Sequence, residues 1–360
     1  MRDRIIRTAQ EMGYRPNRRA QQLRTGVTKT LAVQLDSSTL SCDRRRLTAT
    51  LHMTVFQGVV HHARNRGYYA YLLMPPDNDD VGEIRKQVVD IRSFDGLIML
   101  GLDEMPQKRL SSLCSDIIKA QVPAVSLDKR LIQHGVPFVG ISRDIAIAAA
   151  AERIAELGHR HVAYIGYLGA TYNEPESRHS VYRQCLAGHG IDLKDEDCFE
   201  VLTEVEAYRV VRSKFESWPA DNRPTCLIFH GDHTAMAGMQ AVYDLGLSVP
   251  DDVSIMGMNN APYIHEAIVP LATIDHRYRD LGALLAKAVI DNLTDPLVPL
   301  AESMILPAVF VPNVSLGPVP TGTPRPTRLT NTGSSVPARS SAQTIQSQAT
   351  EYRSEERSTQ

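Results

Sequence analysis

The stretch GYRPNRRAQQLRTGVTKTLAVQL, residues 13–35, joins a short basic N-terminal segment to a long body rich in apolar runs. Asn17 can cap a short helix, and Gly26 is placed to end it. Leu23 is a lone large apolar side chain at the centre of that helix, among five cationic residues: Arg15, Arg18, Arg19, Arg24 and Lys29. An apolar strand follows directly, from Thr30. A cationic helix with one apolar residue, tied to a core strand, predicts a segment that grips nucleic acid.

The charge is distributed unevenly between this end and the rest of the chain. Residues 1–30 hold eight Arg or Lys against two acidic residues, a local charge of +6, although the whole 360-residue chain carries −2. A basic end on an acidic body is typical of proteins with an anionic partner. A solvated basic N-terminus without a partner would give the same balance, so charge alone leaves both interpretations open.

Cysteine usage indicates a reducing compartment, and hydropathy indicates neither a secretory signal nor a membrane span. The five cysteines are scattered and form no CxxC pair, which is typical of buried reduced thiols and not of a disulfide framework or a zinc site. The N-terminus lacks the apolar stretch of a secretory signal, and no apolar run approaches the roughly 18 residues of a membrane span. We therefore expect a cytoplasmic protein, associated with the nucleoid when bound to DNA.

Short apolar strands alternate with amphipathic helices from Thr30 onwards, in two consecutive sets. A single core rarely grows past about 250–300 residues, so a chain of this length has room for two lobes. The alternation predicts an α/β fold with parallel sheets covered on both faces and ligands bound beyond the carboxyl ends of the strands. The expected strands are 30–36, 68–74, 95–100, 123–127, 138–141, 162–165, 226–229, 253–256, 271–274 and a terminal run 304–311.

Both ends of the chain differ from this body. Residues 2–12, RDRIIRTAQEM, predict an amphipathic helix whose apolar face needs a partner, because one short helix cannot fold alone. Residues 318–360 contain 15 Ser or Thr and almost no large apolar side chain. Such a composition cannot bury enough surface to offset the entropy of ordering, so we expect a disordered tail.

Six strings, taken in order, resemble LacI/GalR-type bacterial transcriptional regulators. Residues 13–33 are similar to the linker and hinge helix of that family, GYRPN-A-x-x-LRTG-T-IG. The likeness continues through VSLDKR (125–130), ELGHRHVAYIG (156–166), PTCLIF (224–229), GLSVPDDVSIMGMNN (246–260) and PLATIDHRYRDLG (270–282). It covers roughly residues 1–316, with gaps, and the order and spacing of the strings make it specific.

The resemblance implies a two-lobed periplasmic-binding-protein-like fold, with two parallel sheets flanked by helices, behind a partial helical DNA-binding segment and a hinge helix. Residues 1–14 would be the last helix of a helix-turn-helix domain, and residues 15–29 the hinge helix and linker. The N-terminal lobe would comprise 30–141 with about 275–300, and the C-terminal lobe 142–274 with about 301–317. The chain would cross between the lobes near Ile141–Arg143, Ile274–His276 and about Ala301–Leu306.

The resemblance also implies a homodimer whose paired hinge helices enter the minor groove of operator DNA. Leu23 falls on the leucine that wedges into a base step, at an unstacking cost of about a few kcal/mol that new contacts offset. Basic neighbours such as Arg18 would position the helix on phosphates and groove without specifying bases. The expected DNA-binding residues are Arg15, Asn17, Arg18, Arg19, Ala20, Leu23 and Arg24.

One departure concerns the DNA-binding domain. In this family the chain begins about forty to fifty residues earlier, whereas residues 2–12 match only the third helix of the helix-turn-helix. As written, no residues are available to read the major groove. Two explanations stay open: the true start lies upstream and Met1 is internal, which we favour because an unpaired apolar face is costly, or the regulator is truncated.

The resemblance places a small-molecule effector, a sugar or related metabolite, between the lobes. Asp128 matches a cleft aspartate, Arg178 an effector-binding arginine, and Tyr278 an aromatic that can stack on a sugar face. From spacing alone, Arg178 would be a helix-surface arginine and Tyr278 a core residue. Asp232 stands at the asparagine that contacts effector in the family, and Asn259 at its aspartate. We hypothesise that carboxylate and amide are exchanged, which would alter the ligand.

Other classes of function find less support. The pairs His159/His161 and His230/His233 do not supply the three or four placed ligands of a zinc site, so we expect no metal and no cofactor. No nucleophile elbow, P-loop or dinucleotide-binding motif occurs, so we expect no enzyme. The loop 37–50, with its run Arg44–Arg46, is longer than the family's turn and obscures the ligand class. The main alternative is a cytosolic small-molecule-binding fragment that has lost sequence-specific DNA binding.

Replacing the predicted wedge, Leu23→Ala, should weaken binding to a duplex that bears a palindromic site and leave effector affinity unchanged, because the wedge contacts only DNA. Fluorescence anisotropy with a labelled duplex measures the first quantity and calorimetry the second. Gln22→Ala, on the same helix, is the control. Equal DNA affinity for Leu23→Ala and the unaltered chain would contradict the wedge.

Overall fold

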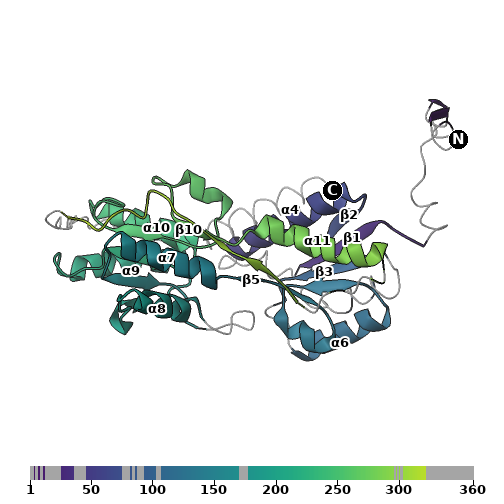
Figure 1. Cartoon of the computed structure of the whole chain (residues 1–360), viewed down its shortest axis with the longest axis horizontal. Helices are drawn as coiled ribbons and strands as arrows, with labels where there is room; N and C mark the ends of the chain where they lie inside the picture. The colour runs from purple at the N-terminus through teal and green to yellow at the C-terminus, as the bar shows by residue number, and fades with distance from the viewer. Residues whose placement is uncertain are drawn as a thin grey trace, which may run out of the picture. The chain divides into compact units, whose positions relative to one another are not determined.

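The computed structural model describes residues 26–35, 46–74, 93–102, 107–169, 177–295 and 303–321, together with residues 4, 7, 8, 11, 12, 82, 86, 297 and 300 (Figure 1). The predicted DNA-binding residues therefore lie outside the described part: Arg15, Asn17, Arg18, Arg19, Ala20, Leu23 and Arg24. The same holds for residue 36 of the expected first strand, residues 37–45 of the long loop, most of the expected helices 2–12 and 81–92, and the tail beyond residue 321.

The first lobe is built on a six-stranded sheet in which every pair is parallel, in the order β11-β5-β4-β3-β1-β2. Its strands are β1 (Thr30–Leu35), β2 (Tyr69–Leu73), β3 (Gly96–Leu100), β4 (Ala124–Ser126), β5 (Phe138–Ser142) and β11 (Ser303–Pro307). β1 lies between β3 and β2, and both its faces are buried: Leu31 and Val33 pack on one side and Ala32 on the other. This two-sided burial explains its continuous apolar sequence.

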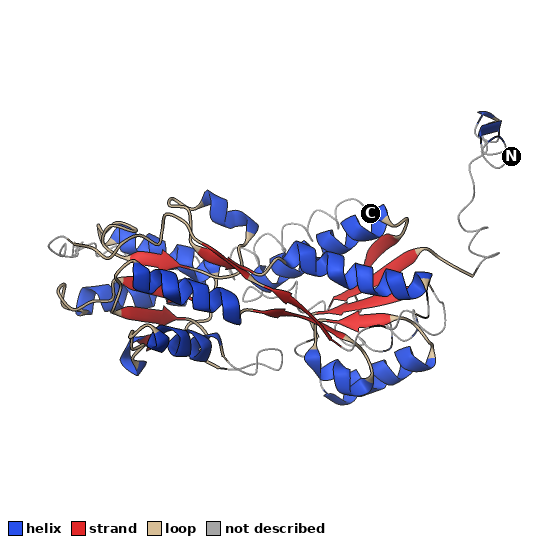
Figure 2. Ribbon diagram, viewed as in Figure 1, coloured by secondary structure: helices blue, strands red, loops and turns tan. Residues whose placement is uncertain are grey.

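Helices cover both faces of the first sheet (Figure 2). One face carries α4 (Arg46–Asn65) and α11 (Tyr278–Thr294), and the other carries α6 (Gln107–Lys119), followed after β4 by the 3₁₀ helix η3 (Lys129–His134). α4 and α11 approach closely because glycines face their contact. A Cβ on Gly58 would overlap the carbonyl oxygen of Arg279, and one on Gly282 would overlap that of Val55. Since α4 begins at Arg46, the end of the expected loop 37–50 is helical.

The second lobe repeats this plan with the parallel sheet β7-β6-β8-β9. Its strands are β6 (Val162–Ile165), β7 (Cys198–Phe199), β8 (Cys226–Phe229) and β9 (Ser254–Met256). Val162 and Tyr164 pack towards α7 (Asp144–Glu156) and α8 (Arg178–Gly188), while Ala163 and Ile165 pack towards α9 (Glu204–Ser217) and α10 (Asp232–Asp244). The short 3₁₀ helices η4 (Asp195–Asp197) and η5 (Pro262–Glu266) lie in its loops. The predicted α/β class with two parallel sheets is confirmed.

The chain passes between the two lobes at three places. It leaves β5 for α7 at Arg143, leaves β10 (Thr273–Asp275) for α11 just before Tyr278, and leaves β11 for β12 (Val309–Val311) at Ala308. The third passage differs from the one expected at about 301–306. β11 pairs with β5 through Pro307, so residues 303–307 extend the first sheet, and β12 then pairs antiparallel with β10.

Hydrogen bonds hold both ends of the body, and the one at the C-terminal end departs from the expected boundary. The backbone N–H groups of Thr28 and Lys29 donate to the two carboxylate oxygens of Asp95 at 2.8 and 2.7 Å, which anchors the chain just before β1. At the other end, Val319 N donates to Leu157 O at 2.8 Å, so residues past the boundary expected at 318 pack on the second lobe. None of the described helices is both long and apolar enough to cross a membrane.

Gly282→Ala should destabilise the chain by about 1–3 kcal/mol, because the added methyl meets the backbone of α4 and cannot be accommodated by a side-chain rotation. Gly188→Ala, at the end of α8 with nothing within 4 Å of the new Cβ, is the matched control and should be neutral or stabilising. Urea unfolding measures both. Equal effects of the two substitutions would refute the close helix contact.

Candidate functional site

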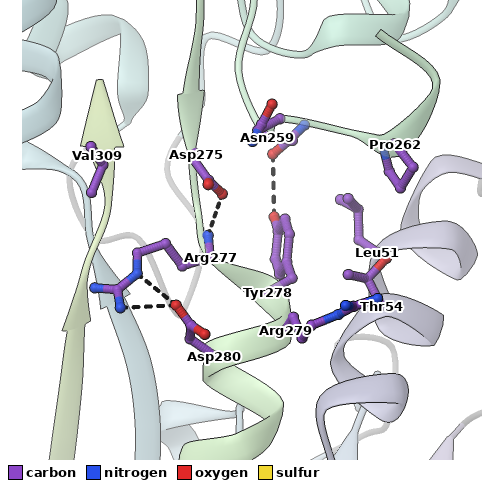
Figure 3. A pocket seen from close by; sticks show the side chains of 11 residues that line it. Leu51, Thr54, Asn259, Pro262, Asp275, Arg277, Tyr278, Arg279, Asp280 and Val309 are labelled. Carbon is purple, nitrogen blue, oxygen red and sulfur yellow. Dashed lines mark hydrogen bonds and ion pairs between the residues drawn. The ribbon is translucent and has the colours of Figure 1, made fainter. Parts of the chain in front are cut away.

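A pocket of about 360 Å³ lies where β10 passes into α11 (Figure 3). Its walls come from the first turns of α4, from the loop after β9, and from the β10–α11 junction. The lining residues of this junction pocket are Leu51, Thr54, Asn259, Asn260, Pro262, Asp275, Arg277, Tyr278, Arg279, Asp280 and Val309. Residues from both lobes therefore meet around one small volume.

The backbone around the junction pocket adopts unusual conformations. Asn259, Asn260 and Arg277 have φ values of 111°, 52° and 55°, in the region that favours glycine. Local contacts hold them: Asn259 N donates to Ile274 O at 2.8 Å, and Arg277 N donates to Asp275 Oδ1 at 2.6 Å. Such strained positions persist only where neighbours over-determine them, and they gather at ligand sites.

The Tyr278 hydroxyl lies between two polar side chains at the pocket wall (Figure 3). Its oxygen is 2.7 Å from His276 Nδ1, and the hydroxyl donates to Asn259 Oδ1 at 3.2 Å. His276 is fully buried, and burial together with nearby Arg143 and Arg178 places its pKa well below the ordinary value. The imidazole is therefore neutral at physiological pH.

The carboxylate of Asp232, at the start of α10, is buried behind the pocket and is not part of its lining. Oδ1 accepts a hydrogen bond from the Thr273 hydroxyl at 2.6 Å, and Oδ2 accepts one from Ala261 N at 2.8 Å. Burial raises the pKa of Asp232 to about 7, although these hydrogen bonds oppose the shift. Asp232 thus ties the loop that carries Asn259 to β10.

The charged side chains that line the junction pocket balance in sign, with Arg277 and Arg279 against Asp275 and Asp280. Arg277 Nε donates to Asp280 Oδ2 at 2.9 Å, and Arg279 donates to Gln57 Oε1 at 3.3 Å. Because the two cations and two carboxylates of the lining sum to zero charge, the site suits an uncharged polar molecule better than an anion. Within the described residues, no group of three or more His, Cys, Asp or Glu is placed to hold a metal ion.

Three comparisons with known proteins point to the same kind of protein. Residues 151–315 match the family model of a periplasmic binding protein-like domain. The arabinose metabolism transcriptional repressor of Geobacillus stearothermophilus is 22% identical over 264 residues, which cover 72% of this chain and 71% of that protein. The fold is similar to that of a lac repressor dimer bound to operator and anti-inducer, with a TM-score of 0.64, 18% identity, and coverage of 88% and 90%. The chain is therefore similar to LacI/GalR-type regulators over most of its length.

The structure of a transcriptional regulator CelR–cellobiose complex is also similar to this chain, with a TM-score of 0.62 and 20% identity, covering 87% of this chain and 90% of that one. Of the five effector residues expected from the family, Asn259 and Tyr278 line the junction pocket and are hydrogen-bonded to each other. Sequence reasoning did not single out Leu51, Thr54 or Arg277. Arg277 lies inside the quoted string PLATIDHRYRDLG, but no sequence pattern marks the two α4 residues.

The remaining three residues expected to bind effector occupy other positions. Asp128 caps η3, and its carboxylate accepts hydrogen bonds from Arg130 N at 2.9 Å and from Arg130 Nε at 3.0 Å. Arg178 opens α8 and donates to the carbonyl of His230 at 2.8 Å. Neither lines the junction pocket, and their effector roles stay predictions.

The pH dependence of stability tests the buried Asp232. With a pKa near 7 in the folded chain and 3.8 as the ordinary value, the folded state holds a proton that the unfolded state has lost. Stability therefore falls as pH rises between these values. Asp232→Asn removes this dependence, so the melting temperature of the variant relative to the unaltered chain should rise from pH 5 to pH 8. Asp251→Asn, at an exposed position, controls for net charge. A gap that is constant with pH would contradict the assignment.

Proposed function

We propose that this chain is a DNA-binding transcriptional repressor whose operator affinity is controlled by a sugar or related metabolite bound in the junction pocket. The observation that carries the proposal is the pocket itself. Its volume, about 360 Å³, falls in the range of about 300–1,000 Å³ typical of small-molecule sites. It joins α4 of the first lobe to the Asn259–Pro262 loop of the second at a passage between lobes.

The chemistry of the lining favours a neutral polyhydroxylated ligand. Tyr278 supplies an aromatic ring that can stack on a sugar face, and Asn259 supplies an amide for its hydroxyls. The paired charges of Arg277 and Asp280 leave the wall without a strong preference for an ion. The printed names of similar proteins, an arabinose metabolism repressor and a cellobiose complex, point to the same class of ligand.

Control of DNA binding would follow from contact with both lobes. A ligand that touches Leu51 and Asn259 together stabilises the arrangement of lobes in which both contacts exist. The predicted hinge, residues 15–29, leads directly into β1, and its last residues are anchored to Asp95. A change in the first lobe would therefore change the direction in which the hinge leaves the body, which is a coupling between two sites. We also propose a cytoplasmic homodimer that presents two hinge helices to DNA.

Binding of arabinose, ribose and cellobiose, measured by calorimetry, tests the ligand site. Asn259→Gly should lower the affinity for whichever sugar binds by about tenfold, because it removes an amide hydrogen bond. Glycine adopts the positive φ at this position without strain. Tyr278→Leu removes the ring and should lower affinity by a similar factor, about tenfold. Tyr69→Phe, an exposed tyrosine on β2, is the control and should leave affinity unchanged.

If no sugar binds, or if both pocket variants bind as the unaltered chain does, the proposal of a sugar site in the junction pocket is wrong. Titration of a palindromic duplex with and without the sugar then separates the two functions. DNA affinity that responds to the sugar supports a regulator. Sugar binding without any DNA binding supports the small-molecule-binding fragment.

A further inference from the structure

Two passages between the lobes are joined by a hydrogen bond. Arg143 lies where the chain leaves β5, and His276 lies between β10 and α11. Arg143 Nε donates to His276 Nε2 at 3.2 Å, and Arg143 Nη1 donates to the carbonyl of Ile141 at 3.3 Å. His276 is in turn 2.7 Å from the Tyr278 hydroxyl, which contacts Asn259. Four side chains thus form one continuous chain of hydrogen bonds that ends at the wall of the junction pocket.

We call the four hydrogen-bonded side chains Arg143, His276, Tyr278 and Asn259 the relay. The donor and acceptor of every hydrogen bond in it follow from Arg143. A guanidinium has donors and no acceptor, so His276 Nε2 must be the acceptor. The imidazole is then neutral, as its complete burial also requires, and its single proton lies on Nδ1. Nδ1–H therefore donates to the Tyr278 oxygen. The proton of the tyrosine hydroxyl is left to donate to Asn259, which must present its carbonyl oxygen Oδ1.

The Asn259 amide carries a second polar group, the amino nitrogen Nδ2. With Oδ1 engaged by Tyr278, the Nδ2 amino group is the polar group that remains for a ligand. No hydrogen bond from Nδ2 is found among the described residues, and Asn259 lines the pocket (Figure 3). An aspartate at this position would present a second oxygen there, which accepts hydrogen bonds. The relay therefore determines whether the wall offers a donor or an acceptor.

Building on the proposed function, we propose that Arg143 and His276 are positioning residues that determine ligand specificity. They orient Asn259 so that its amino group donates to the ligand. The ligand class is one that places a hydrogen-bond acceptor, a hydroxyl or carbonyl oxygen, at this point of the pocket. Neither Arg143 nor His276 is part of the lining, so both act through Tyr278 and Asn259.

The protonation of His276 can be measured without any ligand. In the full-length chain labelled with ¹⁵N-histidine, the ring nitrogens of His276 should show the neutral form with the proton on Nδ1 throughout pH 6–8. The signals are assigned by their loss in His276→Gln and, independently of any variant, by contact of the ring with Tyr278. A proton on Nε2, or a charged ring at neutral pH, overturns the relay.

Sugar analogues test the consequence for specificity. For the sugar that binds best, calorimetry compares single-position deoxy analogues, which lose both donor and acceptor, with deoxyfluoro analogues, which keep a weak acceptor. At one ring position the unaltered chain should bind the deoxyfluoro analogue several-fold better than the deoxy analogue. Asn259→Asp should abolish or reverse that preference. If no position shows a preference for fluorine, Asn259 does not donate to the ligand and the proposal fails.

Two substitutions at His276 separate positioning from mere stability. Gln offers one acceptor and one donor, so His276→Gln can keep the direction of the relay and should retain the fluorine preference. Leu offers neither, so His276→Leu should lose the preference even where the sugar itself still binds. Loss in both variants or in neither overturns the positioning role. If no sugar binds at all, the proposed sugar site is wrong, and the tautomer of His276 alone decides whether the relay exists.

Discussion

The short segment from Asp275 to Tyr278 connects an element packed in the core of one lobe to an element packed in the core of the other. On one side β10 continues towards the second lobe, where Ile274 is buried and Thr273 bonds to Asp232. On the other side Tyr278 begins α11, which packs closely against α4 in the first lobe. The chain makes this transition with Arg277 in the left-handed region, a conformation costly for a non-glycine residue. The junction pocket lies at this transition.

Buried polar groups then determine what the pocket can recognise. A buried carboxylate and a buried imidazole are both costly unless they are hydrogen-bonded, so Asp232 and His276 each take specific partners. Asp232 holds the loop that carries Asn259, and His276 holds Tyr278. The two residues at the wall are thus positioned by two residues behind it. A site supported in this way can present one defined pattern of donors and acceptors.

The hypothesis that Asp232 and Asn259 exchange a carboxylate and an amide treats them as equivalent, but the folded chain places them differently. Aligned strings place both residues in one cleft as equivalent polar groups. In the folded chain Asp232 faces Thr273 and Ala261, whereas Asn259 faces Tyr278 and the pocket. Amide and carboxylate therefore have separate tasks. Asp128 accepts hydrogen bonds from Arg130, two residues further along the chain, a local contact that the family resemblance does not predict.

The sequence by itself determined most of the strands, the alternation of strand and helix, and hence two parallel sheets, because these depend on apolar runs of a few neighbouring residues. It missed the two-residue strand β7 and did not divide the run 304–311 into β11 and β12. It also marked Asn259 and Tyr278 through the likeness to a family. Only the tertiary structure decided which groups share a wall. Arg143 and His276 lie 133 residues apart, and their contact exists only because two passages between lobes are adjacent. The third passage, shifted to Ala308, likewise depends on pairing between β11 and β5, since register is a property of two strands and not of one.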